Sequence, residues 1–187
     1  MADTYQISDQ SGLYFVTLTV IEWVDIFTRM NYKKLIINNL NYCQKNKGLE
    51  IYAYVIMTNH IHLIVRSNSD NLSGTLRDFK SYTSKELLKL VSMQEESRQE
   101  WMLRIFSNAA YKHRRNSVFQ LWSPKNHAEL LWSNEFIEEK LDYIQMNPVR
   151  TGIVLHPEEY LFSSAKNYAG ENVLLDVTLI TKKWKTM

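Results

Sequence analysis

The stretch that decides the fold is Tyr54-Val-Ile-Met-Thr-Asn-His-Ile-His-Leu-Ile-Val-Arg66. Two runs rich in β-branched and aromatic residues flank Met57-Thr58-Asn59, a pattern that predicts a strand, a tight turn and a second strand. Because side chains alternate along a strand, His60 and His62 share one face, while Ile61 and its alternate neighbours point to the other. The stretch therefore predicts a hairpin with one apolar face and one face that bears two imidazoles.

The two histidines allow two interpretations. Residues two apart on a strand are separated by roughly 6.6 Å at Cα, so both rings can bind one metal ion. A His-x-His pair can also be two solvated or hydrogen-bonded histidines on an open sheet face. On this motif alone the second interpretation is favoured.

Length and composition indicate one compact domain with a real core, because the chain has 187 residues, 45% of them hydrophobic and 22% charged. No apolar run approaches the ~18 residues of a membrane span. The polar N-terminus lacks a signal-peptide core, and the lone Cys43 cannot form an internal disulfide, so we expect a cytoplasmic protein that does not enter a membrane. The net charge of +2 is too small to indicate a nucleic-acid binder by itself.

The elements around the hairpin predict a β-α-β-β order. Residues 13–21 are rich in β-branched and aromatic residues and predict a strand inside the sheet. Residues 32–45 show helical spacing of apolar residues, with Gly48 as a stop, and residues 49–56 form the first strand of the hairpin. A long helix is expected over residues 72–97.

Basic charge concentrates between residues 98 and 115, where aromatic residues are interleaved with it. The five basic residues are Arg98, Arg104, Lys112, Arg114 and Arg115. Basic side chains among aromatics suit a phosphate backbone with exposed bases, which predicts DNA binding here. A solvated, loosely helical connection whose aromatics cover the core is an equal alternative. A short strand is expected around residues 118–122, and an extended piece around residues 127–132.

A second helix is predicted over residues 133–146, capped by Ser133 or Asn134. Its buried stripe consists of Ile137, Leu141 and Ile144. Pro148 is expected to end this helix at Asn147. That would place the phenol of Tyr143 and the carboxamide of Asn147 one turn apart at a helix terminus.

The histidine strand and this helix together suggest a chemistry that neither suggests alone. Two imidazoles and a carboxamide oxygen offer three ligands and leave coordination positions open, as in catalytic metal sites. A phenol, with a pKa near 10, is a poor nucleophile at neutral pH unless a metal favours the phenolate. Attack on a DNA phosphate would give a phosphotyrosine and release a sugar hydroxyl. The energy of the phosphodiester bond is kept in the phosphotyrosine bond, so the strand can be rejoined to another end without ATP, which suits strand transfer.

The sequence resembles the single-tyrosine HUH transposases of the insertion-sequence and REP-associated type. The resemblance lies in residues 54–66 and in Asp142-Tyr-Ile-Gln-Met-Asn-Pro-Val-Arg-Thr-Gly-Ile-Val154, and extends to residues 76–85 and 157–168. Thr58 departs from the proline that relatives often have before Asn-His-Ile-His, which leaves every expected ligand in place.

This resemblance implies His60, His62 and Asn147 as metal ligands and Tyr143 as the nucleophile. It implies an α+β fold with a ferredoxin-like, RRM-like antiparallel sheet and helices packed on one face. We expect a catalytic domain over residues 1–155 and a C-terminal extension over residues 156–187.

The implied activity is metal-dependent DNA transposition, in which single-stranded, hairpin-flanked DNA is cleaved and rejoined through a 5′-phosphotyrosine with Mg²⁺ or Mn²⁺. Single-stranded or hairpin DNA is the expected partner, and a homodimer stays open. One alternative is a domesticated, non-catalytic nucleic-acid-binding protein on the same scaffold. Another is a small zinc hydrolase with a structural Tyr143, which the lack of a glutamate beside the histidines disfavours.

Overall fold

The computed structural model describes residues 6–93, 96–113 and 117–181. Within them, an antiparallel sheet has the strand order β2-β3-β1-β4. Its strands are β1 (Tyr14–Thr19), β2 (Leu49–Ile56), β3 (His60–Ser67) and β4 (Ala128–Leu130). The predicted hairpin is therefore present as β2 and β3, and β1 lies inside the sheet as expected.

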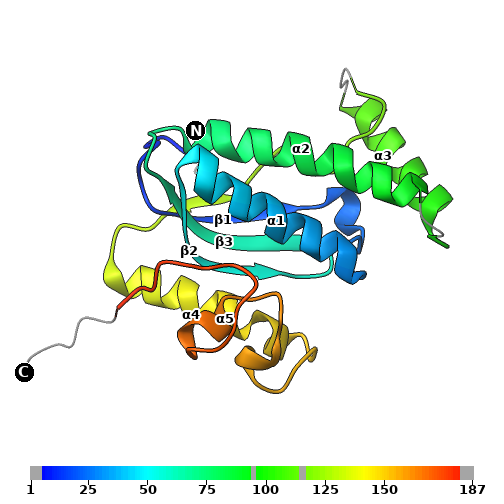
Figure 1. Ribbon diagram of the computed structural model, residues 1–187. Helices are drawn as coiled ribbons and strands as arrows, with labels where there is room; N and C mark the ends of the chain where they lie inside the picture. The colour runs from blue at the N-terminus through cyan, green and yellow to red at the C-terminus, as the bar shows by residue number, and fades with distance from the viewer. Residues whose placement is uncertain (1–5, 94–95, 114–116, 182–187) are drawn as a thin grey trace, which may run out of the picture.

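The helices cover both faces of this sheet. They are the 3₁₀ turn η1 (Ile21–Trp23), α1 (Met30–Lys47), α2 (Leu72–Met93), α3 (Gln99–Lys112), α4 (Asn134–Arg150), the 3₁₀ turn η2 (Pro157–Glu159) and α5 (Ala165–Tyr168). The long helices α1 and α2 lie together on one face, and α4 lies against β2 and β3 from the other (Figure 1). The α+β class and the antiparallel sheet are as the sequence predicted, but the expectation that the helices pack on one face needs correction, because α4 covers the second face.

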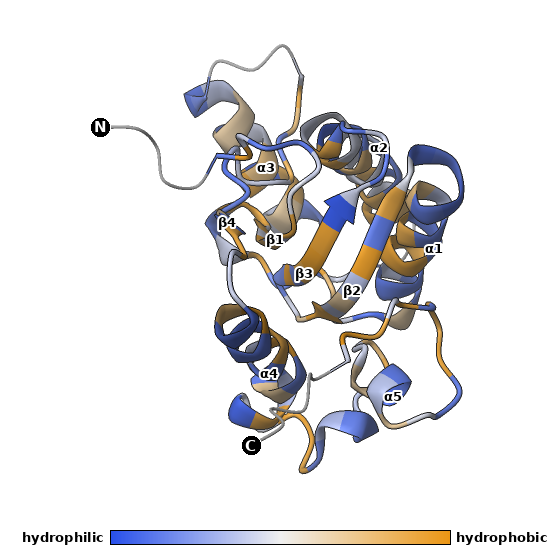
Figure 2. Cartoon of the chain, turned by 90° about the vertical axis from the view of Figure 1, so that its left-hand side faces the viewer, coloured by the Kyte–Doolittle hydropathy of each residue, from blue (hydrophilic) through white to orange (hydrophobic). Residues whose placement is uncertain are grey.

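Side chains of β3 alternate between the two faces of the sheet, and each face packs against a different layer of helices. In β3, the side chains of Ile61, Leu63 and Val65 are fully buried and alternate with His60 and His62. Strands β2 and β3 are correspondingly hydrophobic between the two helical layers (Figure 2). Thr17 of β1 stands opposite His62 in the register of β1 with β3. The face with the histidines is thus the one that α4 covers.

Helix α1 ends as the sequence predicted. Gly48 adopts the left-handed conformation with φ 64°, and its N–H donates to the carbonyl of Cys43. Glycine adopts this conformation without the cost that a Cβ would add. The chain then enters β2 at Leu49, so the sharp turn sets the start of the hairpin.

The C-terminal segment covers the outer edge of β2. The backbone N–H of Ile56 donates to Phe162, and that of Ser164 donates to Tyr54. Further along, Thr178 donates to the carbonyl of Ile51. An exposed strand edge is a template for unwanted pairing, so this segment completes the sheet. The division of the chain at residue 156 stays a prediction.

The helix predicted over residues 72–97 and the strand predicted around residues 118–122 need correction. The single helix expected over residues 72–97 is shorter, because α2 ends at Met93 and α3 begins at Gln99. The strand expected around residues 118–122 is reduced to an isolated bridge between Val20 and Trp122. In the described ranges, no helix combines the length and apolarity that a membrane crossing requires.

Candidate active site

Helix α4 begins at a side-chain cap and continues past the proline. Ser133 Oγ accepts a hydrogen bond from the N–H of Phe136 at 3.2 Å. The prediction that Pro148 ends the helix at Asn147 is wrong, because α4 runs to Arg150. Proline removes its own N–H from the helix ladder and crowds the carbonyl four residues earlier, but both effects are confined to that turn. The next turn is still closed by the Thr151 N–H, which donates to the Asn147 carbonyl at 3.1 Å.

The tyrosine of α4 lies on the histidine strand within one chain. The ring centroid of Tyr143 is 5.1 Å from that of His62 and 5.9 Å from that of Phe15 in β1. Its side chain is not enclosed, since 37% of the residue's surface is exposed. The structure thus brings together two of the side chains that the sequence assigned to one site, with the phenol open to solvent.

Each histidine is oriented through Nδ1. His60 Nδ1 lies 2.7 Å from Asn59 Oδ1, and His62 Nδ1 lies 2.9 Å from Thr17 Oγ1. Partners at the second ring nitrogen are typical of metal-binding histidines, because they fix the tautomer and the ring plane. The amide oxygen of Asn59 can only accept, so His60 carries its proton on Nδ1 and leaves the Nε2 lone pair available.

The spacing of the two rings fits a shared ion. A ring bound through nitrogen at about 2.1 Å has its centroid about 3.2 Å from the ion, so two rings whose nitrogens subtend a right angle at the ion have centroids about 4.6 Å apart. The centroids of His60 and His62 are 4.6 Å apart. His62 Nε2 is buried and makes no hydrogen bond within the described part of the chain. An orphaned buried ring nitrogen of this kind calls for an explanation, and a metal ion would supply one.

The electrostatics keep His62 neutral. Burial lowers the pKa of His62 to about 3, and the electrostatic influence of the neighbouring His60 and Lys140 side chains acts in the same direction. Burial also lowers the pKa of His60, although Asp25 opposes the effect. A neutral imidazole is the form that coordinates a metal. The residues present therefore fit a divalent ion, and the neighbouring lysine adds positive charge for an anionic substrate.

Asn147 is buried on α4, one turn after Tyr143. Across residues 6–93, 96–113 and 117–181, no group of three or more His, Cys, Asp or Glu side chains could hold an ion. A third protein ligand would therefore come from another residue type, such as the carboxamide of Asn147. Its role as a ligand stays a prediction.

Sequence reasoning missed several residues that shape this site. Thr17 and Phe15 contact His62 from β1, and strict alternation along residues 13–21 would have placed them on one face. Lys140 lies 4.8 Å from the ring centroid of Phe15 and pairs with Glu129 at 3.0 Å. The guanidinium of Arg150 lies 5.5 Å from the centroid of the Tyr143 ring.

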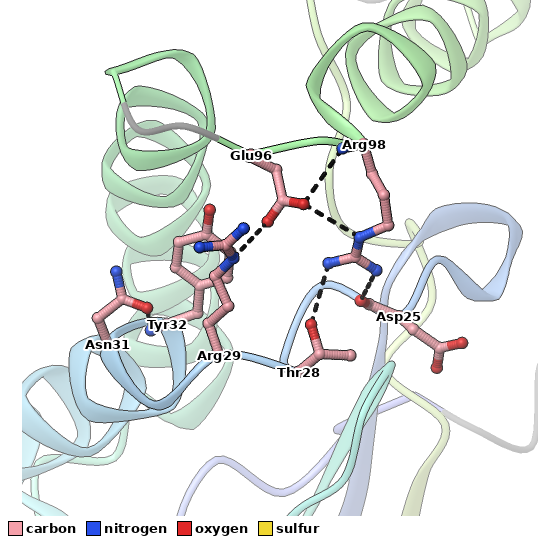
Figure 3. A network of polar contacts seen from close by, with 7 residues as sticks. All are labelled: Asp25, Thr28, Arg29, Asn31, Tyr32, Glu96 and Arg98. Atoms are coloured by element: carbon pink, nitrogen blue, oxygen red, sulfur yellow. Dashed lines mark hydrogen bonds and ion pairs between the residues drawn. The ribbon is translucent and has the colours of Figure 1, made fainter.

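The predicted DNA-binding residues are not all available to DNA. Arg98 Nε donates to Glu96 Oε1 at 3.1 Å, and its two other nitrogens donate to the Asp25 carbonyl and to Thr28 Oγ1 (Figure 3). Arg98 therefore joins the start of α3 to the segment before α1. Arg104 and Lys112 are exposed on α3, while Arg114 and Arg115 lie outside the described residues.

Helix α3 bears on the two interpretations of residues 98–115, which were a DNA-binding segment and a solvated, loosely helical connection. Residues 99–112 form a regular helix and not a loose connection. The side chain of Phe106, on the inner face of this helix, is fully buried. By contrast, Tyr111 is 90% exposed. DNA binding by the exposed basic residues of this helix stays a prediction.

Comparison with known proteins places these observations in context. The family model described as "Transposase IS200 like" matches residues 13–120, more than half of the chain. The match includes the histidine strand and ends before α4. No curated protein matches. A solved structure of a REP-associated tyrosine transposase bound to a REP hairpin has a similar fold, with a TM-score of 0.62 and 16% identity over 98% of this chain and 96% of that chain.

Proposed function

This chain belongs to the IS200-like transposase family, and from that premise we propose that it is a metal-dependent transposase that cleaves and rejoins single-stranded, hairpin-flanked DNA through a phosphotyrosine on Tyr143. The observation that supports the proposal most is the packing of Tyr143 against His62, whose Nε2 is buried and has no hydrogen-bond partner in the described part of the chain. If Tyr143 had only a packing role, the unsatisfied buried nitrogen of His62 beside it would be unfavourable for stability and would have no compensating purpose. The hairpin bound by the similar solved structure supports DNA of this form as the substrate.

Tyr143 would act as the nucleophile. Its oxygen forms a bond to phosphorus while the bond between phosphorus and the 3′-oxygen of the preceding nucleotide breaks. The phenol proton is lost, and the leaving 3′-oxygen gains a proton, so the products are a 5′-phosphotyrosine and a free 3′-hydroxyl. The reverse attack by another 3′-hydroxyl rejoins strands without an outside energy source.

His60, His62 and Asn147 would hold the divalent ion. When bound, the ion polarises the phosphodiester and offsets its negative charge. Imidazole nitrogens and a carboxamide oxygen are compatible with Mg²⁺ or Mn²⁺ in turnover. Thr17 and Asn59 keep the two rings in position, because each contacts an Nδ1 atom.

Positive charge around the phenol supports the same role. The guanidinium of Arg150 lies over the face of the Tyr143 ring. A cation over an aromatic face is attracted to it, and it attracts a phenolate more strongly than a phenol. Arg150 would thus help to hold both the nucleophile and an incoming phosphate.

The test is cleavage of hairpin DNA that carries a single-stranded flank and a label at either end, with Mg²⁺ or with a chelator. We expect the 3′-labelled fragment to migrate with protein on a denaturing gel and the 5′-labelled fragment to be free and extendable by a polymerase. Free 5′-phosphate ends would instead indicate a hydrolase, and intact DNA would indicate a non-catalytic binder.

A further inference from the structure

A groove on another part of the molecule has the chemistry of a nucleic-acid site. It encloses about 590 Å³ between α2 and residues 117–126. Its lining includes none of the candidate active-site residues. Three of the described residues that line it are basic, and none is acidic. The groove is therefore a separate place where an anion is favoured.

The wall formed by α2 presents cations and hydroxyls in a row. Ser73, Arg77, Ser81 and Lys85 are all exposed and follow one another at intervals of four residues. Four residues of helix rise about 6 Å, so the row repeats at nearly the same angle around the helix. That step is comparable to the distance between neighbouring phosphates on an extended strand.

Two acidic residues of α2, Asp78 and Glu86, each directly follow a cation of this row in the sequence, and neither lines the groove. Asp78 pairs with Lys47 of α1 at 3.2 Å and lines the groove between α1 and α2. Its contact with Arg77 is 3.4 Å long and exposed. Exposed ion pairs of this kind contribute little, so Arg77 keeps most of its attraction for a phosphate.

The opposite wall is different in kind. Val118 and Phe119 are apolar, and Gln120 is 8% exposed with an Oε1 that makes no hydrogen bond to any described residue. The Nε2 of Gln120 donates to the carbonyl of Trp122, so the side-chain amide is fixed. A carbonyl oxygen accepts only from a donor, which a nucleobase amine offers and a phosphate does not.

Lys80 ties the two walls together. Its Nζ donates to the carbonyl of Ser123 at 2.7 Å and to Asn126 Oδ1 at 2.8 Å. The same loop runs along β1, because Ser123 donates to the Thr19 carbonyl and Thr17 donates to the Asn126 carbonyl. Thr17 contacts His62 on the other face of the sheet. The groove and the candidate active site therefore flank the same part of β1.

We propose that this groove binds an unpaired stretch of the DNA strand that flanks the hairpin, with its phosphates on the α2 wall and its bases on the wall formed by residues 118–120. The proposal rests on the proposed function. An unpaired strand has one charged side and one side of apolar faces and amines, which matches two unlike walls. A paired stem keeps its bases stacked and presents only their edges in its grooves, so it would offer no base face to Val118 and Phe119.

The test measures binding with Tyr143→Phe as the background, so that no DNA is cleaved. Arg77→Gln and Lys85→Gln are introduced together, and Lys34→Gln with Lys45→Gln on exposed positions of α1 gives the same change in charge elsewhere. Fluorescence anisotropy follows a hairpin with a single-stranded flank and a blunt hairpin at several salt concentrations.

For the flanked hairpin, each lost phosphate contact should lower the slope of log affinity against log salt by about 0.7, so the groove variant should lose about 1.4. The control pair and the blunt hairpin should show no such loss. An unchanged slope with the flanked hairpin, or an equal loss with both DNAs, would overturn the proposal.

These results separate the two proposals. If the groove variant loses slope as expected but the wild-type protein forms no adduct with DNA, the proposed function is rejected and the groove proposal is kept. If the wild-type protein forms the adduct but the groove variant keeps the full slope of log affinity against log salt, only the groove proposal is rejected. Absence of DNA binding would reject both.

Discussion

Two clusters of buried polar side chains differ in how completely they are satisfied. At the junction before α3, Glu96 accepts from Arg29 at 2.7 Å and from Arg98 at 3.1 Å (Figure 3). At the candidate active site, His62 Nε2 is buried without a partner among the described residues. An unsatisfied buried group costs about 1–3 kcal/mol. The first cluster therefore stabilises the fold, whereas the second carries an unsatisfied atom that the proposed function assigns to a metal ion.

This difference can be tested by removing each cluster in turn. Replacing His60 and His62 together with alanine should abolish DNA cleavage, because the two imidazoles that would hold the ion are lost. DNA affinity should persist, since phosphate contacts elsewhere provide it. Cleavage and DNA binding are measured on the same preparation.

The matched control for the histidine variant is His113→Ala, which removes an exposed imidazole at the end of α3. It should cleave DNA like the wild type. Full cleavage by the double variant with Mg²⁺ present would contradict the site.

The opposite behaviour is expected at the junction. Glu96→Gln should lower the free energy of unfolding by about 2 kcal/mol, because two charge-assisted hydrogen bonds lose their carboxylate. Cleavage per folded molecule should be unchanged. Urea denaturation gives the stability, and Glu100→Gln, an exposed change in the first turn of α3, is the control.

The carboxylate of Glu96 should also affect how the free energy of unfolding depends on pH in the acid range. Burial opposes ionisation of Glu96, but hydrogen bonds from Arg98 and Arg29 outweigh it and hold the pKa of this side chain below its ordinary value of 4.5. Its contribution to stability is therefore full above pH 4.5 and is lost as the pH falls through the lower, folded-state pKa. The acid limb of the stability curve should be flatter in Glu96→Gln, and an unchanged limb would assign the acid sensitivity to other groups.

A smaller effect is expected from the residue that orients His62. Thr17→Val removes the hydroxyl at Nδ1 and keeps the shape of the side chain. Loss of such a partner should weaken metal binding by about tenfold or more. Titration of Mn²⁺ by calorimetry checks this, with Thr19→Val on the same strand as control. Equal affinities in all three proteins would show that Thr17 does not position a ligand.

The hairpin could be predicted because its pattern is local. The bounds of β2 agree with the predicted residues 49–56, and β3 begins at His60, since alternation, the Met57-Thr58-Asn59 turn and Gly48 all act within a few residues. The convergence of Tyr143 and His62 followed from the family resemblance. Periodicity alone could not have shown that α4 crosses the sheet at that point.

Contacts between distant segments explain what sequence reasoning missed. The segment between α2 and α3 contains Glu96, whose partner Arg29 lies 67 residues away and could not be identified from local pattern. Arg98 was assigned to DNA because a charge pattern does not distinguish a cation that binds phosphate from one that pairs inside the fold. The continuation of α4 through Pro148 likewise depends on burial of the proline and on the bonds made by Thr151.

The central claim is that Tyr143 is the nucleophile, and mapping of the covalent DNA adduct tests it most directly. Wild type and Tyr143→Phe are incubated with labelled hairpin DNA and Mg²⁺, denatured, digested and analysed by mass spectrometry. We predict a DNA-linked peptide that contains Tyr143 in the wild type, and no adduct in the variant, although the variant folds and binds DNA. An adduct that survives in the variant, or that maps to the exposed Tyr111 or to Tyr168, would contradict the claim.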